Sequence, residues 1–189
     1  MSGEASRARF QSLFEAYRLD IASYCNWRSS SVADAEDAVA EVFLVAWRKI
    51  DLVPPGDAAR AWLYATARRV TANARRSLHR RDALADRISQ ERQPDDVSAE
   101  ETVVHEALAM LGELDREVLF LVEWEGFRPA ELAEVLECQE VTARGRLHRA
   151  RLRFRDAFEA VLGEQANSAA GRPGMTPGRF TSTTREAEA

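Results

Sequence analysis

The sequence predicts an all-α protein: two small helical domains joined by a flexible linker, the second of them a helix-turn-helix. Three observations carry this prediction. Apolar residues recur at spacings of three and four along most of the chain, and no segment alternates as a β-strand would. A polar stretch divides the periodic segments into two groups. The second group ends in a short helix, a three-residue turn and a longer helix.

The first domain is predicted to span residues 1–81 and to contain three helices. An apolar stripe predicts the first helix over residues 10–24. Ser31, with an acid three residues later, predicts the start of the second helix. A Pro-Pro-Gly run at residues 54–56 ends that helix, because proline cannot donate the helical hydrogen bond. The third helix is expected over residues 57–81.

The rest of the chain divides into a linker, a second domain and a tail. Residues 82–97 are polar and acidic, so we expect an acidic flexible linker there. The second domain is predicted over residues 98–162, with a proline at the first position of a short helix at 129–136. Residues 163–189 are rich in small and polar types, which predicts a disordered tail.

The composition argues against several classes of protein. No run approaches the roughly 18 apolar residues of a membrane span, and the N-terminus lacks a signal-peptide core, so a cytoplasmic location is expected. Cys25 and Cys138 lack the paired spacing of a zinc or redox site. Acidic neighbours such as Glu36 and Asp37 point about 100° apart on a helix, which disfavours a shared metal. We therefore expect no enzyme, catalytic residue, metal, cofactor or small-molecule substrate.

Positive charge is concentrated in two segments, although the formal net charge is −5. Residues 68–81 hold six arginines and no acid, and residues 144–155 hold six more and no acid. Between them, residues 82–140 hold 17 acids and four arginines. Local patches rather than the total charge set binding to phosphate, so two nucleic-acid-binding surfaces are expected.

The final helix is the stronger candidate, because its apolar residues recur at positions 143, 147, 150, 154 and 158 and should be buried. Its arginines then face outward, as in a recognition helix that enters the major groove. The alternative is a helical hairpin with a solvated basic face. The candidate DNA-binding residues here are Arg144, Arg146, His148, Arg149 and Arg151.

The helix at 57–81 combines aromatic residues with arginines, which suits a single-stranded nucleic acid whose bases stack on rings. Trp62 can equally be a core residue. The candidate residues are Trp62, Arg68, Arg69, Asn73, Arg75 and Arg76. A third group, the acids from Asp34 to Glu41, fits either a protein-docking face or a solvated helix N-terminus.

Three segments resemble bacterial RNA polymerase sigma factors of the extracytoplasmic-function (ECF) group. They are DAEDAVAEVFLVAWRKI (34–50), AWLYATARRVTANARRSLHRR (61–81) and LGELDREVLFLVEWEGFRPAELAEVLECQEVTARGRLHRARLRF (111–154). The resemblance implies a transcription initiation factor with two domains. Region 2 would dock on the polymerase clamp helices and melt the −10 element, and region 4 would bind the −35 element. The implied partners are core RNA polymerase, promoter DNA and an anti-sigma factor, which is often membrane-bound.

The resemblance also implies a role for individual residues. The polymerase-docking helix matches at Asp37, Glu41, Phe43, Trp47 and Arg48, and the loop that captures a flipped base matches at Leu52–Ala59. The melting helix matches at Trp62, Asn73, Arg75 and Arg76, and the −35 helix at Arg144, Arg146, His148 and Arg149. Three positions depart from the family pattern: Ala40 replaces a glutamine, Arg69 an asparagine of the base pocket, and Arg128 a Ser or Thr cap.

The competing hypothesis is an autonomous helix-turn-helix regulator that binds DNA without polymerase, usually as a dimer. The sequence shows no obvious effector domain or coiled-coil seam for it. Under the sigma-factor hypothesis, each DNA contact is weak by itself, and the free protein should bind DNA poorly. The acids Asp95, Asp96, Glu100 and Glu101 are expected to occupy basic surfaces of the free protein or the polymerase cleft.

Overall fold

The protein is described by a computed structural model that covers residues 3–82 and 99–170. Within these ranges it contains α-helices and no strand, which confirms the all-α prediction. The helices are α1 (Gly3–Arg28), α2 (Val32–Arg48), α3 (Ala58–Asp82), α4 (Ala99–Ala109), α5 (Glu113–Leu119), α6 (Pro129–Val135) and α7 (Glu140–Ala170). A 3₁₀ turn, η1 (Ile50–Leu52), follows α2, and a π-helical turn, η2 (Phe120–Trp124), follows α5.

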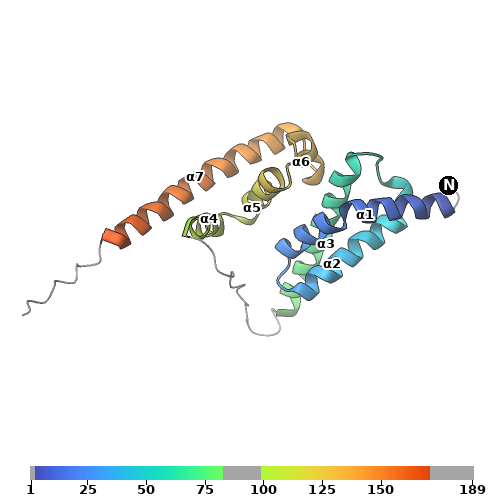
Figure 1. Cartoon of the computed structure of the whole chain (residues 1–189), viewed down its shortest axis with the longest axis horizontal. Helices are drawn as coiled ribbons and strands as arrows, with labels where there is room; N and C mark the ends of the chain where they lie inside the picture. The colour runs from blue at the N-terminus through green and yellow to red at the C-terminus, as the bar shows by residue number, and fades with distance from the viewer. Residues whose placement is uncertain (1–2, 83–98, 171–189) are drawn as a thin grey trace, which may run out of the picture.

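The N-terminal unit is a bundle in which α1, α2 and α3 all pack on one another (Figure 1). The predicted start of α2 is confirmed, since Ser31 Oγ accepts a hydrogen bond from the Asp34 N–H at 3.1 Å. The turn before α3 passes through Gly56, whose φ of +63° lies in the left-handed region that glycine adopts without strain. Ile21, Tyr24 and Leu63 are fully buried at the centre of the bundle.

The C-terminal unit is built around the long helix α7, which packs on α4, α5 and α6 (Figure 1). The N-terminal half of α7 buries the predicted apolar stripe, with Ala143 and Ala150 at 0% exposure. The C-terminal half of α7 packs on α4 through a separate small cluster that includes Val103 and Val161. The short helix α6, a turn and α7 form the predicted helix-turn-helix.

Some boundaries differ from those expected. The apolar run that begins at residue 103 is split between α4 and α5, and Gly112 stands as the N-cap of α5. Helix α7 continues to Ala170, beyond the start of the predicted tail at residue 163. The predicted linker after Asp82 and the tail beyond Ala170 lie outside the described residues.

The two units lie side by side and share one apolar core (Figure 1). The contact runs mainly between α3 and α6. Aromatic rings from both units also meet along this interface: Trp27 of α1 stacks on Phe120 of η2 with 4.6 Å between centroids and 10° between planes. Tyr64 of α3 meets Phe127 edge-on at 4.8 Å. Aromatic pairs of this geometry add to the free energy of burying their surface.

Candidate polymerase and nucleic-acid interfaces

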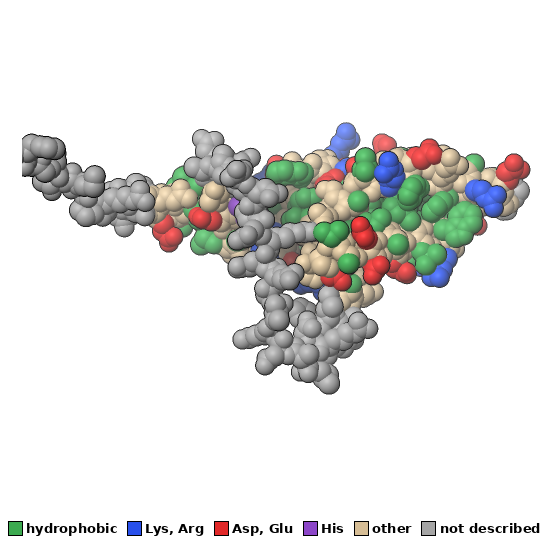
Figure 2. All heavy atoms as spheres, turned by 60° about the horizontal axis from the view of Figure 1, so that its bottom comes forward, with side chains coloured by type: hydrophobic (Ala, Val, Ile, Leu, Met, Phe, Trp, Pro, Cys, Tyr) green, Lys and Arg blue, Asp and Glu red, His purple; other side chains and the backbone are tan. Residues whose placement is uncertain are grey.

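The solvent face of α2 combines charged groups with exposed apolar side chains. Asp37, Glu41, Leu44 and Arg48 are all exposed, and their spacing of three and four places them on one face. Trp47 beside them keeps 41% of its surface exposed. Figure 2 shows hydrophobic side chains gathered over the N-terminal unit, bordered by charged groups. Apolar patches rimmed by polar groups mark protein-docking sites, so this face is a candidate docking surface.

Phe43 does not belong to this surface, although the resemblance placed it in the polymerase-docking set. Phe43 is 5% exposed, and its ring packs edge-on against Phe14 with 4.9 Å between centroids. Its neighbour on the helix, Val42, is also buried, because both lie on the core side of α2. The structure therefore shows Phe43 packed between α1 and α2, where its ring holds the two helices together, and the contact of Phe43 with a partner stays a prediction.

The loop between α2 and α3, which the resemblance matches to base capture, is anchored at both ends. Ile50, Val53 and Ala59 form a small buried cluster under it. The loop also receives a hydrogen bond from the Arg9 side chain to the Val53 carbonyl. Leu52 projects outward with 69% of its surface exposed. The loop thus presents the Leu52 side chain to solvent from a fixed backbone.

Helix α3 places the predicted −10 residues in different surroundings. Arg69, Asn73 and Arg76 are exposed. Trp62 is half-buried and packs on both the main core and the small cluster under the loop. Of the two roles that the sequence left open for Trp62, the structure therefore favours the core role.

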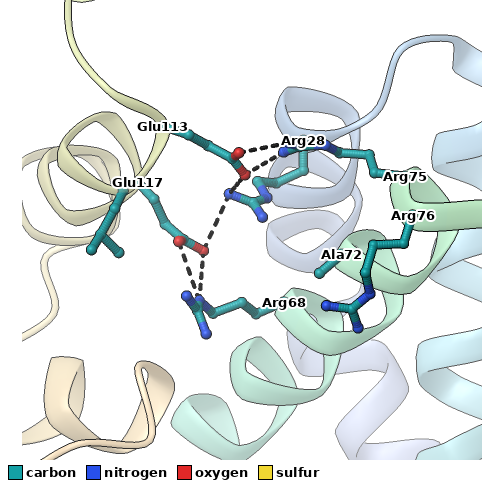
Figure 3. Close-up of a pocket in the computed structure, with 8 residues that line it drawn as sticks. Arg28, Arg68, Ala72, Arg75, Arg76, Glu113 and Glu117 are labelled. Carbon is teal, nitrogen blue, oxygen red and sulfur yellow. Dashed lines mark hydrogen bonds and ion pairs between the residues drawn. The ribbon is translucent and has the colours of Figure 1, made fainter. Parts of the chain in front are cut away.

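Two further arginines of α3 meet acids of the C-terminal unit (Figure 3). Arg68 Nε donates to both carboxylate oxygens of Glu117, at 3.1 and 3.2 Å. Arg75 donates from both terminal nitrogens to Glu113, and its Nη2 lies 2.6 Å from the carboxylate. Arg28, the last residue of α1, lies 2.9 Å from Glu113 and 3.5 Å from Glu117. Acids of α5 thus hold arginines of α1 and α3.

Burial controls the electrostatics of this cluster. Glu117 is 1% exposed and accepts a hydrogen bond from the Tyr24 hydroxyl at 2.6 Å. Burial, and then the charge of Glu117, raise the pKa of Tyr24 well above its usual value. Hydrogen bonds from Arg75 lower the pKa of Glu113. The side chain of Arg28 is also buried, and its Nε finds no acceptor within the described part of the chain.

A second set of contacts joins the units nearer the start of α3. Arg60 Nη2 donates to the backbone oxygen of Glu125 at 2.8 Å and to its carboxylate at 2.9 Å. The same guanidinium lies over the ring of Phe127, 4.3 Å from its centroid. The Tyr64 hydroxyl donates to the Glu125 carboxylate. Burial and this hydrogen bond raise the pKa of Tyr64.

Helix α7 turns the predicted −35 residues away from its buried stripe, so their predicted orientation is confirmed. Arg144, His148, Arg149 and Arg151 are exposed, and Arg146 is half-buried. Arg144 pairs with Glu140 one turn earlier at 2.6 Å, and Arg151 pairs with Glu123 at 2.7 Å. Their contact with DNA stays a prediction.

The turn between α6 and α7 fixes the angle at which α7 begins. Glu137, two residues past the end of α6, has a φ of +51°, and the Cys138 N–H donates to the Ala133 carbonyl at 3.0 Å. At the other end of α6, the Arg128 N–H donates to the Glu131 carboxylate at 2.7 Å. The Arg128 side chain carries donors only, so it cannot accept from the first turn as Ser or Thr would.

Sequence reasoning missed the acids of the C-terminal unit that pair with arginines of the N-terminal unit. They are Glu113, Glu117, Glu125 and Glu137, the last of which lies 3.0 Å from Arg69. The sequence placed all four within an acidic stretch without telling paired acids from solvated ones. One signal was available, because Glu117 directly precedes the apolar run at 118–122. The acids that were expected to cover basic surfaces, at 95–101, have no described side chains.

No three His, Cys, Asp or Glu side chains in residues 3–82 and 99–170 come together as a metal ion would need. Among the helices described, none has a stretch long and apolar enough to cross a membrane.

Comparison with known proteins matches both units to one family. The model of Sigma-70 region 2 matches residues 13–81, and that of Sigma-70 region 4 matches residues 102–154. The ECF RNA polymerase sigma factor SigL of Mycobacterium tuberculosis is 30% identical over 153 residues, which are 76% of this chain and 85% of SigL.

Solved structures agree with this match. The sigma factor RpoE of Bartonella quintana, in complex with the anti-sigma factor NepR, superposes with a TM-score of 0.66 at 25% identity, over 79% of this chain and 96% of RpoE. CnrH, in complex with the cytosolic domain of CnrY, has the same fold, with a TM-score of 0.56 at 23% identity over 80% of this chain and 88% of CnrH.

Both regions occur in order on one chain, which does not favour the autonomous regulator. The chain belongs to the ECF RNA polymerase sigma factors, and is a factor that binds RNA polymerase and sets its promoter specificity.

Proposed function

We propose that the two units divide promoter recognition between them, with α7 reading the −35 element and α3 and its preceding loop melting the −10 element. The observation that carries this proposal is the orientation of α7. Its apolar stripe is buried, so Arg144, His148 and Arg149 face solvent near the start of the helix. A recognition helix uses its N-terminal part to reach base edges, and arginine forks onto guanine or phosphate oxygens.

The exposed face of α2 is the proposed docking surface for core polymerase. It joins the acids Asp37 and Glu41 to the exposed side chains Leu44 and Trp47. This mixture supports a protein partner, because an apolar centre supplies affinity and a charged rim sets orientation. Phe43 contributes by holding α2 on α1.

Polymerase would also supply the affinity that each DNA contact lacks. A few arginines per unit make a weak and salt-dependent contact. When both units sit on one polymerase, the second DNA contact becomes effectively intramolecular, and the overall affinity rises without any new contact.

We further propose an anti-sigma factor as a regulatory partner. RpoE and CnrH resemble this chain in fold. RpoE was solved with the anti-sigma factor NepR, and CnrH was solved with the cytosolic domain of CnrY. The exposed apolar face of α2 supports this proposal, since a competitor of polymerase would cover the same side chains. A Trp47→Ala substitution should then weaken the binding of both core polymerase and the inhibitor.

The proposed function includes no catalysis, cofactor or small-molecule substrate, because phosphodiester chemistry belongs to the polymerase. The proposed location is the bacterial cytoplasm, where that polymerase acts.

The test is run-off transcription from a genomic promoter library, with and without core polymerase. Specific initiation that requires core is expected, and Arg149→Ala should reduce it about tenfold or more, the usual effect of one lost bidentate base contact. Arg155→Ala is the matched control, because Arg155 is an exposed arginine farther along α7. Tight binding by the protein alone, with no effect on core, would overturn the proposal.

A further inference from the structure

The side of α7 that points directly away from the core begins with an apolar side chain rather than an arginine. Four residues at spacings of four, three and four form this side of the helix: Val141, Gly145, His148 and Leu152. Ala143, the first residue of the buried stripe, follows Val141 by two residues, which is about 200° around the helix axis at about 100° per residue. The Val141 side chain is therefore directed away from the buried stripe.

The position of Val141 in the helix matters more than its exposure. Val141 keeps 72% of its surface exposed, and single exposed apolar residues are common on proteins. However, Val141 is the second residue of α7, which is the second helix of the helix-turn-helix. In this motif the N-terminal residues of the second helix reach the edges of the bases. Val141 thus stands where the proposed DNA contact would be made.

Arginines lie on both sides of this face rather than at its centre. Arg144 follows Val141 by three residues and Arg149 follows it by eight, so they lie about 60° to one side and about 80° to the other. Arg144 is held in place by Glu140, whose Oε1 accepts from its Nε at 2.9 Å and from its Nη2 at 2.6 Å. Long side chains on the two flanks can reach phosphates on both walls of a groove. The floor of the groove is then left to the shorter side chains between them.

One turn after Val141, Gly145 leaves a gap in the same face. A Cβ built on Gly145 would meet only the Arg149 side chain, at 3.4 Å, so packing within the protein does not require a glycine there. Glycine is also a poor helix former, so it does not serve the stability of α7. The gap admits a small group close to the helix backbone, and the Val141 side chain forms its apolar border.

The chemistry of this border selects among the bases. Thymine is the base that presents a methyl group, on its C5 atom, in the major groove, whereas the other groups there are mainly hydrogen-bond donors and acceptors. A valine gains free energy by burying a methyl group. It cannot bond a donor or acceptor, and it deprives such a group of water at a cost. A valine at this place therefore favours thymine.

We propose that Val141 is a specificity-determining residue that holds the C5-methyl group of one thymine of the −35 element, in the gap over Gly145. The arginines on the flanks hold α7 in the groove, and Val141 sets the preferred base at one position. The inference rests on the proposed function for the identity of the duplex as the −35 element. The apolar centre of the exposed face does not depend on that function.

The test removes the methyl group from the DNA and the side chain from the protein in turn. Run-off transcription is measured with core polymerase and limiting full-length protein, on promoters in which each −35 thymine is replaced singly by uracil, which lacks only the C5-methyl group. At one position the wild type should lose about fourfold in initiation, as expected for one buried methyl group. Val141→Ala should initiate about fourfold less on the thymine promoter and lose nothing further with uracil.

Two controls separate this contact from other effects. Leu152→Ala is the matched protein control, because Leu152 is an exposed apolar residue on the same side of α7, eleven residues or about 16 Å farther along the helix. It should keep the uracil sensitivity of the wild type. On the DNA side, the wild type but not Val141→Ala should prefer 5-methylcytosine to cytosine at that position. This preference distinguishes a methyl contact from a change in the stiffness of the duplex.

Three results would overturn the contact: equal initiation with thymine and uracil at every position, the same uracil sensitivity in Val141→Ala, or a −35 element without thymine on either strand. Absence of core-dependent initiation by the wild type would instead overturn the proposed function. The thymine and uracil comparison would then be made by gel shift on duplexes that the full-length protein selects without core. It would still decide whether Val141 reads a methyl group, and failure to select any duplex would count against it.

Discussion

At the scale of single residues, burial decides which groups can react or bind. Cys25 is fully buried, and this burial raises the pKa of its thiol to about 12. Cys138 lies half-buried in the turn of the helix-turn-helix. Only the thiolate reacts readily with disulfide reagents, so the two cysteines should differ sharply in reactivity.

A thiol titration with an aromatic disulfide reagent at pH 8 checks this difference. We expect one thiol to react in the native protein and two in denaturant. Cys138→Ser should remove the native reaction and leave the denatured one. Rapid modification of Cys25 in the folded variant would show that α1 opens far more often than its packing implies.

Gly145 is the second residue with a measurable consequence. A Cβ built on it would meet only the Arg149 side chain, at 3.4 Å, so alanine fits. Gly145→Ala should stabilise the C-terminal unit by about 1 kcal/mol, since glycine is a poor helix former. Urea unfolding measures this gain. If initiation falls although stability rises, Gly145 serves close approach to DNA instead.

At the scale of elements, α6 begins without the usual side-chain cap. Arg128 occupies the N-cap, and its side chain offers no acceptor to the N–H groups of the first turn. Of the two bonds of a capping box, only the one from the Arg128 N–H to the Glu131 carboxylate therefore forms. Because α6 positions α7 in the helix-turn-helix, a frayed start would loosen the recognition helix.

Arg128→Ser should therefore raise the free energy of unfolding by about 1 kcal/mol. Thermal unfolding followed by circular dichroism measures the shift, with Arg128→Ala as the control that removes the arginine without adding a cap. Equal stability of the serine and alanine variants would mean that solvent already satisfies the first turn.

The sequence predicted elements well where a single rule decides them. The buried stripe of α7, the Ser31 cap and the turn at Gly56 each follow from local spacing or backbone geometry. Phe43 and Trp62 were harder, because a family role at a position does not say whether its side chain points inward. The pairing of Glu117 with Arg68 was out of reach, since it joins residues 49 positions apart across two units.

At the scale of the whole molecule, the free energy of unfolding should depend on pH in the alkaline range. The pKa of Tyr24 is raised in the folded protein, which therefore favours the protonated hydroxyl. The unfolded chain releases this proton near pH 10, and the folded state holds it to higher pH. The stabilisation is therefore complete below about pH 10 and is lost as the pH rises through the raised value.

Tyr24→Phe tests this linkage by urea unfolding at pH 8 and pH 10.5. At pH 8 the variant should lose about 2 kcal/mol, the contribution of a hydrogen bond to a charged group. Its stability should then fall less steeply with pH than that of wild type. Parallel pH profiles for the two proteins would show that Tyr24 does not contribute to the alkaline transition.

The stacking of Trp27 on Phe120 gives the molecule an optical signal of its own. Trp27 belongs to one unit and Phe120 to the other, so separation of the units transfers the indole from an apolar contact into water. Its fluorescence emission would then move to longer wavelength. The difference in emission between the wild-type protein and a Trp27→Phe variant would isolate this signal, so separation of the units could be followed in real time without any attached dye.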